Sequence, residues 1–156
     1  MKRYYNSDIL DSHNLIPVED IENRHSFYES DYIDELNCVV AILYVQNKIT
    51  SITFYDIEFS EVVSSYVNKN FGNIKIITFH NLSELNKITK IYMEGKLSTV
   101  WTYQYYSANK LKLSILQDEM NNLIEYRQSI YDELGNHIEE KIFFADSWTI
   151  HTEKMI

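Results

Sequence analysis

Alternation of apolar and polar residues dominates the second half of the chain. Within 97–106 one face carries Thr99 and three aromatic residues at every second position, with Thr102 and Gln104 on the other face, and within 110–115 leucine and isoleucine alternate with lysine and serine. A period of two places neighbouring side chains on opposite faces of a strand, so both segments are predicted to be strands. The aromatic stripe consists of Trp101, Tyr103 and Tyr105. It is interpreted as core, with an exposed aromatic platform as the alternative.

Turn-forming residues divide this half of the chain into hairpins. Residues 123–131 and 137–144 flank Gly135-Asn136, which is the strongest hairpin signal in the sequence. Further turns are predicted at 46–48, 94–96 and 120–122, and the fourth at 134–136. Each turn should have a strand on either side.

Three short segments resemble one another within the chain. Asp34-Glu35-Leu36-Asn37 recurs as Asp118-Glu119-Met120-Asn121-Asn122 and as Asp132-Glu133-Leu134-Gly135-Asn136. Each copy is polar and rich in turn formers, and each precedes an apolar run. Recurrence of this kind is typical of hairpin loops in an antiparallel meander.

The first half of the chain contains a strand of a different kind. Val39 to Val45 is apolar without interruption, which predicts a central strand covered on both faces. Cys38 stands at its head and is predicted to be a buried structural thiol rather than a nucleophile. As the one cysteine in the chain, it excludes an internal disulfide.

One segment departs from the strand pattern. Apolar residues between Phe59 and Val67 follow the spacing of an amphipathic helix. Ser60 is a suitable N-cap and Gly72 follows shortly after the end, so residues 60–70 are predicted to be a helix. Phe59, Val63 and Tyr66 should face inward, covering one face of the 39–45 strand.

These elements predict an α+β, strand-dominated fold. We expect a twisted antiparallel β-meander of six to eight strands with one main helix at about 60–70 packed on it; the alternative is an all-β sheet or barrel. Only three glycines and one proline occur, so no linker is visible, and residues 1–156 are predicted to form a single domain.

Charge is distributed unevenly along the chain. The net charge is −9; residues 118–156 carry nine acidic and three basic side chains, whereas 67–117 carry two and seven. Such acidity disfavours nucleic acid and anionic membrane as partners and favours a basic protein. The alternative is that the acidity maintains solubility. The sequence shows no secretory signal and no apolar run of membrane-spanning length, so the chain is expected to be cytoplasmic.

Recognisable catalytic chemistry is missing from the sequence. No two of the five histidines have the spacing of a local metal site, and no nucleophile elbow or phosphate-binding glycine loop occurs. Glu125 and Arg127 share a strand face and are predicted to form a surface ion pair. His80, at the end of an apolar run, is predicted to make a local hydrogen bond. The chain is therefore predicted not to be an enzyme and to need no cofactor or metal.

The loop repeats and the stretch from Tyr131 to Lys141 resemble the tyrosine–aspartate β-repeats of bacterial polymorphic toxin systems. Small size, acidity and tyrosine richness are similar to those of immunity proteins from contact-dependent growth inhibition and related toxin loci. The resemblance implies an antitoxin that occludes the active site of a cognate toxin, most simply a nuclease with a basic cleft.

Six acidic residues are the predicted partner-binding set, namely Asp118, Glu119, Asp132, Glu133, Glu139 and Glu140. A non-enzymatic protein-binding or scaffold module and a small-molecule-binding domain are the alternatives. The identity of the toxin, the contacting acidic surface and the oligomeric state stay open at this point.

Overall fold

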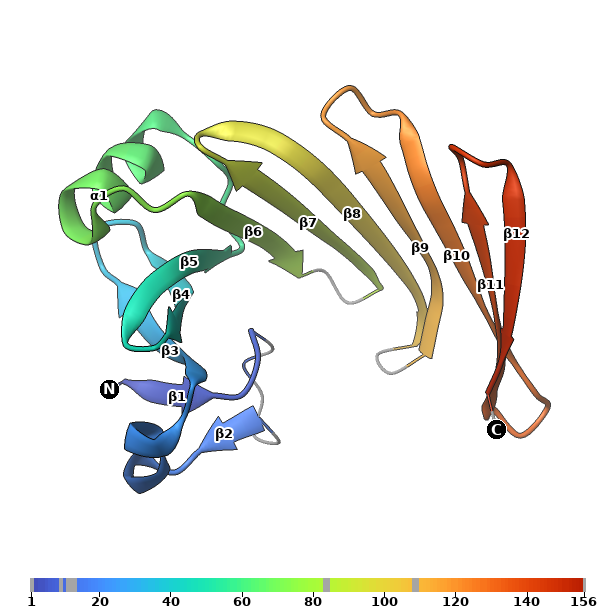
Figure 1. Cartoon of the computed structure of the whole chain (residues 1–156), viewed down its shortest axis with the longest axis horizontal. Coiled ribbons are helices and arrows are strands. Elements are labelled where there is room, and N and C mark those ends of the chain that lie inside the picture. Colours follow the sequence, from blue (N-terminus) through green and yellow to red (C-terminus); the bar gives the residue numbers. More distant parts are fainter. Residues whose placement is uncertain (1, 9, 11–13, 83–84, 108–109, 156) are drawn as a thin grey trace. The chain divides into compact units, whose positions relative to one another are not determined.

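The computed structural model describes residues 2–8, 10, 14–82, 85–107 and 110–155 (Figure 1). Strands dominate these residues, and their hydrogen-bonding order is β12-β11-β10-β9-β8-β7-β6-β5-β4-β3-β1-β2, which does not close on itself. The chain divides into two compact units. Unit 1 comprises residues 1–80 and 91–96, and unit 2 comprises 81–90 and 97–156. That they form a single domain stays a prediction.

The elements of unit 1 come first along the chain: β1 (Arg3–Tyr5), β2 (Leu15–Ile16), the 3-10 helix η2 (Val18–Asn23), β3 (Ser26–Ile33), β4 (Cys38–Val45), β5 (Lys48–Tyr55) and α1 (Glu61–Phe71). Three strands contribute residues to both units, β6 (Ile76–Leu82), β7 (Asn86–Met93) and β8 (Lys96–Ser107), of which only Lys96 belongs to unit 1. Unit 2 continues with β9 (Lys110–Asp118), β10 (Leu123–Tyr131), β11 (His137–Phe144) and β12 (Thr149–Lys154).

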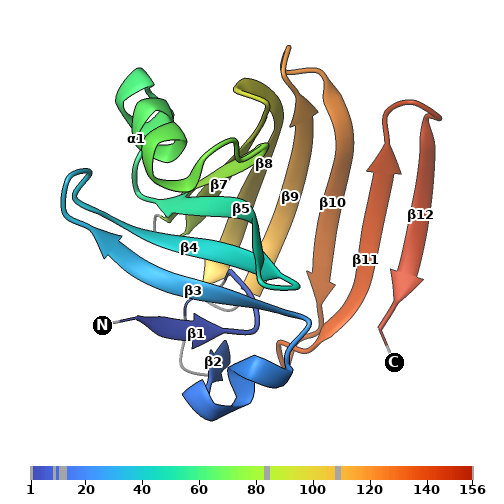
Figure 2. The ribbon, with the colours of Figure 1, turned by 60° about the vertical axis from the view of Figure 1, so that its left-hand side comes forward.

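The core of unit 1 lies between β4–β6 and α1 (Figure 2). Cross-strand partners form two apolar rows on one face, Val40–Phe54–Phe79 and Ile42–Ile52–Ile77. The helix adds Val63 and Val67, each 1% exposed, to these rows. The rings of Phe54 and Phe79 stack with centroids 5.3 Å apart. The predicted central strand is confirmed, because Val40 and Ala41, on opposite faces of β4, are both fully buried.

The predicted helix is confirmed, and its ends follow the expected chemistry. The Ser60 side chain accepts a hydrogen bond from the Val63 N–H at 3.3 Å, which satisfies one of the free donors at the helix start. Gly72 ends the helix with φ of 74°, a conformation that costs glycine little. Phe59 and Tyr66 pack against the core cluster, as the spacing predicts.

One strand pair departs from a pure antiparallel meander. β5 and β6 are parallel, with Ile52 opposite Ile77. Parallel neighbours need a crossover connection, and α1 provides it. The strand-dominated class is confirmed. The strands number twelve in the described residues, against the six to eight predicted, and two of them, β1 and β2, contain only three and two residues.

Residues with a left-handed backbone, several of them asparagine or glycine, form the hairpin turns. Gln46 and Asn47 have φ of 50° and 60° between β4 and β5, and Glu94 and Gly95 have 51° and 79° between β7 and β8. Two consecutive residues with positive φ form the type of tight turn that matches strand twist. The predicted turns at 120–122 and 134–136 lie between strands, and those at 46–48 and 94–96 do so except for their last residues, Lys48 and Lys96, which begin β5 and β8.

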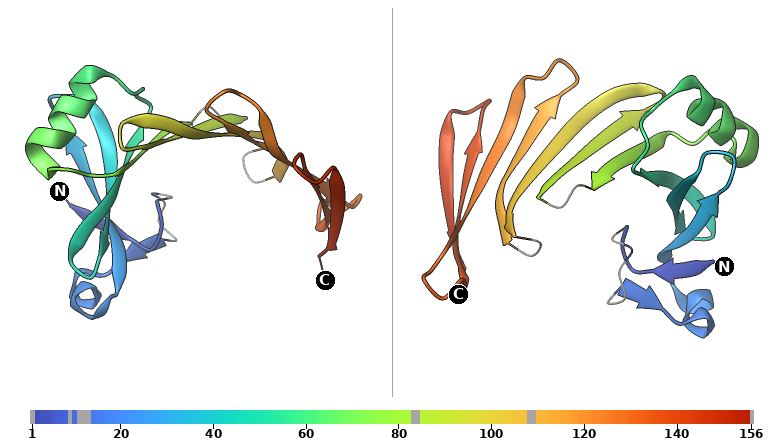
Figure 3. Two further views of the ribbon diagram at one scale, coloured as in Figure 1. Left: turned by 45° about the horizontal axis from the view of Figure 1, so that its top comes forward. Right: turned by 180° about the vertical axis from the view of Figure 1, so that it is seen from behind.

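Unit 2 is built differently from unit 1, because its described residues contain strands and loops but no helix (Figure 3). Strands β8 to β12 follow one another in antiparallel pairs. Their alternation leaves Ile124 on one face and Phe144 on the other, and Ile150 of β12 is 69% exposed. The layer of strands therefore has apolar residues on both faces.

Candidate functional site

The two repeated loops of unit 2 are fastened by their first aspartates. Asp118 accepts hydrogen bonds from the Asn122 N–H at 2.8 Å and from the Asn122 side chain at 2.8 Å. Asp132 makes the same two contacts with Asn136, at 2.8 and 2.9 Å. The pKa of each aspartate is lowered, mainly by the hydrogen bond from the asparagine side chain. These two carboxylates are thus engaged within their own loops.

The third copy of the repeat forms a related turn in unit 1. In all three copies the aspartate C=O accepts from the N–H three residues on: Asn37, Asn121 and Gly135, at 3.2, 3.1 and 2.9 Å. Each donor residue has positive φ. The repeats are therefore hairpin loops, as the sequence predicts.

The two remaining loop carboxylates lie far apart. Glu119 precedes β10 and Glu133 follows it, so they occupy opposite ends of a nine-residue strand. At roughly 3.4 Å per residue these ends are about 27 Å apart. Glu139 and Glu140 point to opposite faces of β11, as predicted for neighbours on a strand. The six predicted residues are not brought together, and their role in partner binding stays a prediction.

The register of the strands instead places a different set of residues on one face of β8–β12. Tyr103, Ser114, Arg127, Ile142 and His151 are successive cross-strand partners, so they form one row across five strands. A parallel row begins with Trp101 and contains Glu125, and a third contains Ser129, Glu140 and Glu153. We call this the carboxylate face, defined by Trp101, Tyr103, Glu125, Arg127, Glu140 and Glu153.

Arg127 is the cation of the carboxylate face. Its Nε donates to Glu125, and its Nη1 lies 3.6 Å from Glu140 Oε2. The pKa of the Arg127 guanidinium is raised, mainly by the hydrogen bond with Glu125. The negative charge of Glu153 also raises it. One positive charge therefore faces three glutamates.

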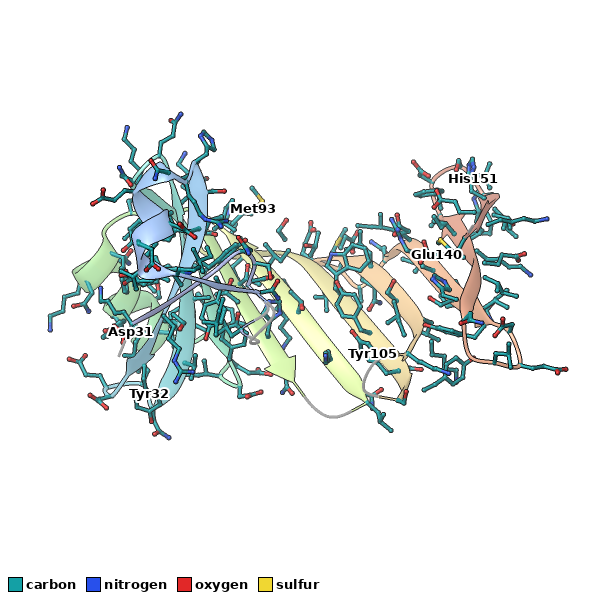
Figure 4. The ribbon with its side chains drawn as sticks, turned by 90° about the horizontal axis from the view of Figure 1, so that it is seen from below. Asp31, Tyr32, Met93, Tyr105, Glu140 and His151 are labelled. Carbon is teal, nitrogen blue, oxygen red and sulfur yellow. The ribbon has the colours of Figure 1, made fainter. Side chains whose placement is uncertain are left out.

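Burial distinguishes this network from an ordinary surface pair. The side chains of Glu125 and Glu140 are 10% and 13% exposed, whereas that of Arg127 is 37% exposed. The sequence predicts Glu125 and Arg127 to form a surface ion pair. The structure confirms the pair, but the Glu125 carboxylate is largely buried. Figure 4 labels Glu140 and His151, which belong to neighbouring strands of this region.

Two aromatic rings border the network. Trp101 and Tyr103 stack with centroids 5.8 Å apart and planes 12° from parallel. Both side chains are half-buried, so the stripe is neither wholly core nor wholly exposed. The register shifts after Gln104, and beyond it Lys87 Nζ lies 4.8 Å from the Tyr105 ring centroid.

A hollow of about 580 Å³ lies at the loop between β10 and β11. Lys110 Nζ is 5.7 Å from the Tyr131 ring centroid, and Lys112 Nζ is 5.6 Å from that of Tyr106. The Lys110 ammonium lies over Gly135, where an added Cβ would come within 2.0 Å of it. The lining of this hollow combines Lys110 and two tyrosines with the carboxylates of Asp132 and Glu133.

A polar cluster in unit 1 joins His80, Asp8 and Tyr55. His80 Nε2 lies 3.1 Å from Asp8 Oδ2, and the Tyr55 hydroxyl donates to the Asp8 backbone oxygen. The hydrogen bond with His80 lowers the pKa of Asp8, and burial raises that of Tyr55. Asp8, the partner in this contact, is 72 residues away, and the predicted local hydrogen bond of His80 stays a prediction. The cluster fastens the N-terminal segment to β5 and β6.

Other candidate chemistry is sparse in the described residues. Cys38 is 6% exposed and burial raises the pKa of its thiol, which confirms the predicted buried thiol. In the part of the chain that the structure describes, no three His, Cys, Asp or Glu side chains form a group that could hold a metal ion. His13 lies outside the described residues. The prediction that the chain is not an enzyme stays a prediction.

Neither described helix is long and apolar enough to cross a membrane. Comparisons with models of protein families, with curated proteins and with solved structures found no match for this chain. Evidence about function therefore comes from the chemistry of its own residues.

Proposed function

We propose that the chain binds a protein with a basic surface through the carboxylate face. The observation that supports this best is the charge balance at Arg127. A single guanidinium lies among Glu125, Glu140 and Glu153, so the group carries a net charge of −2. Lysine or arginine side chains of a partner would complete the pairing that Arg127 begins.

The aromatic rings of Trp101 and Tyr103 also suit a protein-binding surface. Tryptophan, tyrosine and arginine are the residues that most often carry the binding energy of protein interfaces. Trp101 and Tyr103 offer flat apolar area beside the carboxylates, and the described part of unit 2 has no helix over either side of its strands. A partner that covers this face would also bury the apolar side chains of a one-layer sheet.

The negative charge of residues 118–156 also favours a basic partner. Residues 118–156 hold nine acidic and three basic side chains. Opposite fields raise the rate of encounter between proteins, and salt reduces this effect because the Debye length falls from about 10 Å at 0.1 M to about 3 Å at 1 M. Binding is therefore expected to weaken with salt, mainly through slower association.

The more specific proposal is that the partner is a toxin and that binding blocks its active site. Its support is the resemblance of the hairpin loops, the small size and the acidity to those of immunity proteins. A toxin that acts on nucleic acid needs a basic cleft to hold phosphates, and such a cleft is complementary to the carboxylate face. A partner of another kind would make the chain a scaffold module with the same binding surface.

Co-expression with the protein encoded by the adjacent gene tests the proposal. We expect a complex that survives size-exclusion chromatography at low salt, and growth of cells in which the adjacent product alone is toxic. Complex formation without toxicity would favour the scaffold alternative. Failure to form a complex and failure to protect cells would together reject the antitoxin proposal.

A further inference from the structure

Strand β12 ends the hydrogen-bonding order, and its outer edge pairs with no other described strand. All six of its residues are exposed, and Trp148 and Ile150 are 83% and 69% exposed. Proteins protect such an edge with short strands, charged side chains, proline, a bulge or a covering element. β12 carries Glu153 and Lys154, but it contains no proline, and its pairing with β11 runs without a register shift. The edge is therefore open to another strand.

The direction of each backbone group in β12 follows from one hydrogen bond. The Met155 N–H donates to the Ile138 C=O at 3.0 Å, directly beyond the last residue of the strand. In an antiparallel ladder the backbone groups of alternate residues face the same neighbour. Glu153 and His151 therefore direct their N–H and C=O toward β11. Those of Ile150, Thr152 and Lys154 face outward.

We propose that this edge pairs with β12 of a second copy of the chain, antiparallel and centred on Thr152. A two-fold axis perpendicular to the strands then relates the two copies, and the carboxylate faces of both lie on the same side. Thr152 exchanges its N–H and C=O with Thr152 of the second copy. Ile150 and Lys154 are paired in the same way, once on each side of the axis.

Side-chain chemistry favours this register over its two neighbours. With Thr152 at the centre, His151 stands opposite Glu153 of the second copy, where an imidazole N–H can donate to a carboxylate, and symmetry forms this contact twice. Centring on His151 loses both histidine–glutamate contacts, and centring on Glu153 places two carboxylates opposite each other, which is unfavourable. The His151–Glu153 positions are non-hydrogen-bonded pairs, where side chains approach most closely.

The other cross-strand contact suits a solvent-exposed edge. Ile150 stands opposite Lys154 of the second copy, whose aliphatic stem can cover the isoleucine while its ammonium stays in water. Six residues of strand from each copy form a small interface, at the low end of the range for specific association. The dimer is therefore expected to be concentration-dependent.

Sedimentation velocity of the full chain over a range of concentrations tests the dimer and its register. His151→Glu places glutamate against glutamate twice, and Glu153→His places histidine against histidine twice, so each variant alone should be monomeric. In an equimolar mixture both contacts are again glutamate–histidine, and dimers should return. Glu139→His makes the same substitution on β11, away from the outer edge, and should leave the dimer unchanged.

Thr152→Pro tests the dimer independently of the charges. The N–H of Thr152 faces outward, so proline removes a hydrogen bond to the second copy and none to β11. The circular dichroism of the chain should therefore be unchanged. A wild-type chain that stays monomeric at all concentrations would overturn the proposal, as would dimerisation of Thr152→Pro like the wild type. Monomeric single variants whose mixture fails to dimerise would overturn the register.

Discussion

The two units stabilise their strands by different means. In unit 1, α1 covers the Val40 and Ile42 rows, so side chains such as Phe54 and Val63 are almost completely buried. In unit 2 the most buried side chains of β9 and β10 are polar, namely Ser114, Glu125 and Ser129. Stability in unit 1 is therefore dominated by apolar packing, whereas polar and ionic contacts are more prominent in unit 2. The strands that lack an apolar second layer are the ones that present the proposed binding face.

The largest effect is expected from truncating the core of unit 1. Phe54 is 0% exposed and stacks on Phe79, so Phe54→Ala should lower the free energy of unfolding by about 3–5 kcal/mol. Trp148→Ala removes a large ring of unit 2 that is 83% exposed, and a loss within about 0.5 kcal/mol is expected. Urea denaturation measures both. Equal losses would contradict the contrast between the units.

A smaller loss of stability is expected when Arg127, the cation of the carboxylate face, is replaced. Arg127→Met leaves Glu125 and Glu140, both largely buried, without their positive partner. Breaking a fully buried pair costs about 3–5 kcal/mol, and we expect about 1–3 kcal/mol because Arg127 is partly exposed. Replacing Glu125 with glutamine in the same chain should recover part of the loss in a urea titration. No recovery would show that Arg127 acts by packing alone.

The loop aspartates should contribute stability that depends on pH. Their pKa lies below 3.8 in the folded chain, so deprotonated Asp118 and Asp132 favour folding above about pH 3.8, and this contribution is lost as pH falls through the folded value. Asp132→Ala should therefore destabilise the chain at neutral pH, and its effect should shrink as the pH falls below about 3.8. Urea midpoints at neutral pH and at a series of acidic pH values measure this. A constant difference would assign the effect to the backbone of the loop.

Local pattern predicted most of unit 2. The bounds of β10 and β11 coincide with the predicted 123–131 and 137–144, because alternation and turn residues determine a hairpin without long-range help. The parallel β5–β6 pair could not be predicted in the same way. It depends on the crossover through α1, which is a tertiary arrangement, and period two does not distinguish parallel from antiparallel neighbours.

The candidate site was only partly predictable for the same reason. Glu125 and Arg127 share a face at a spacing of two, so their pairing was visible in the sequence. Glu140 and Glu153 join them through the register of three strands, which the sequence alone does not determine. A search for alternating charges in adjacent predicted strands would have found Glu140 as a candidate. His80 and Asp8 meet across 72 residues, with no local signal.

Glu139 and Glu140 provide the most direct test of the proposed binding face, because they are neighbours in sequence on opposite faces of β11. Glu140→Gln removes one charge from the carboxylate face and can still accept a hydrogen bond from Arg127; Glu139→Gln removes one charge from the other face. Affinity for the protein encoded by the adjacent gene would be measured by titration at low and high salt. We predict that Glu140→Gln weakens binding about tenfold at low salt and that Glu139→Gln changes it little. Equal effects of the two variants, or no effect of either, would contradict the account.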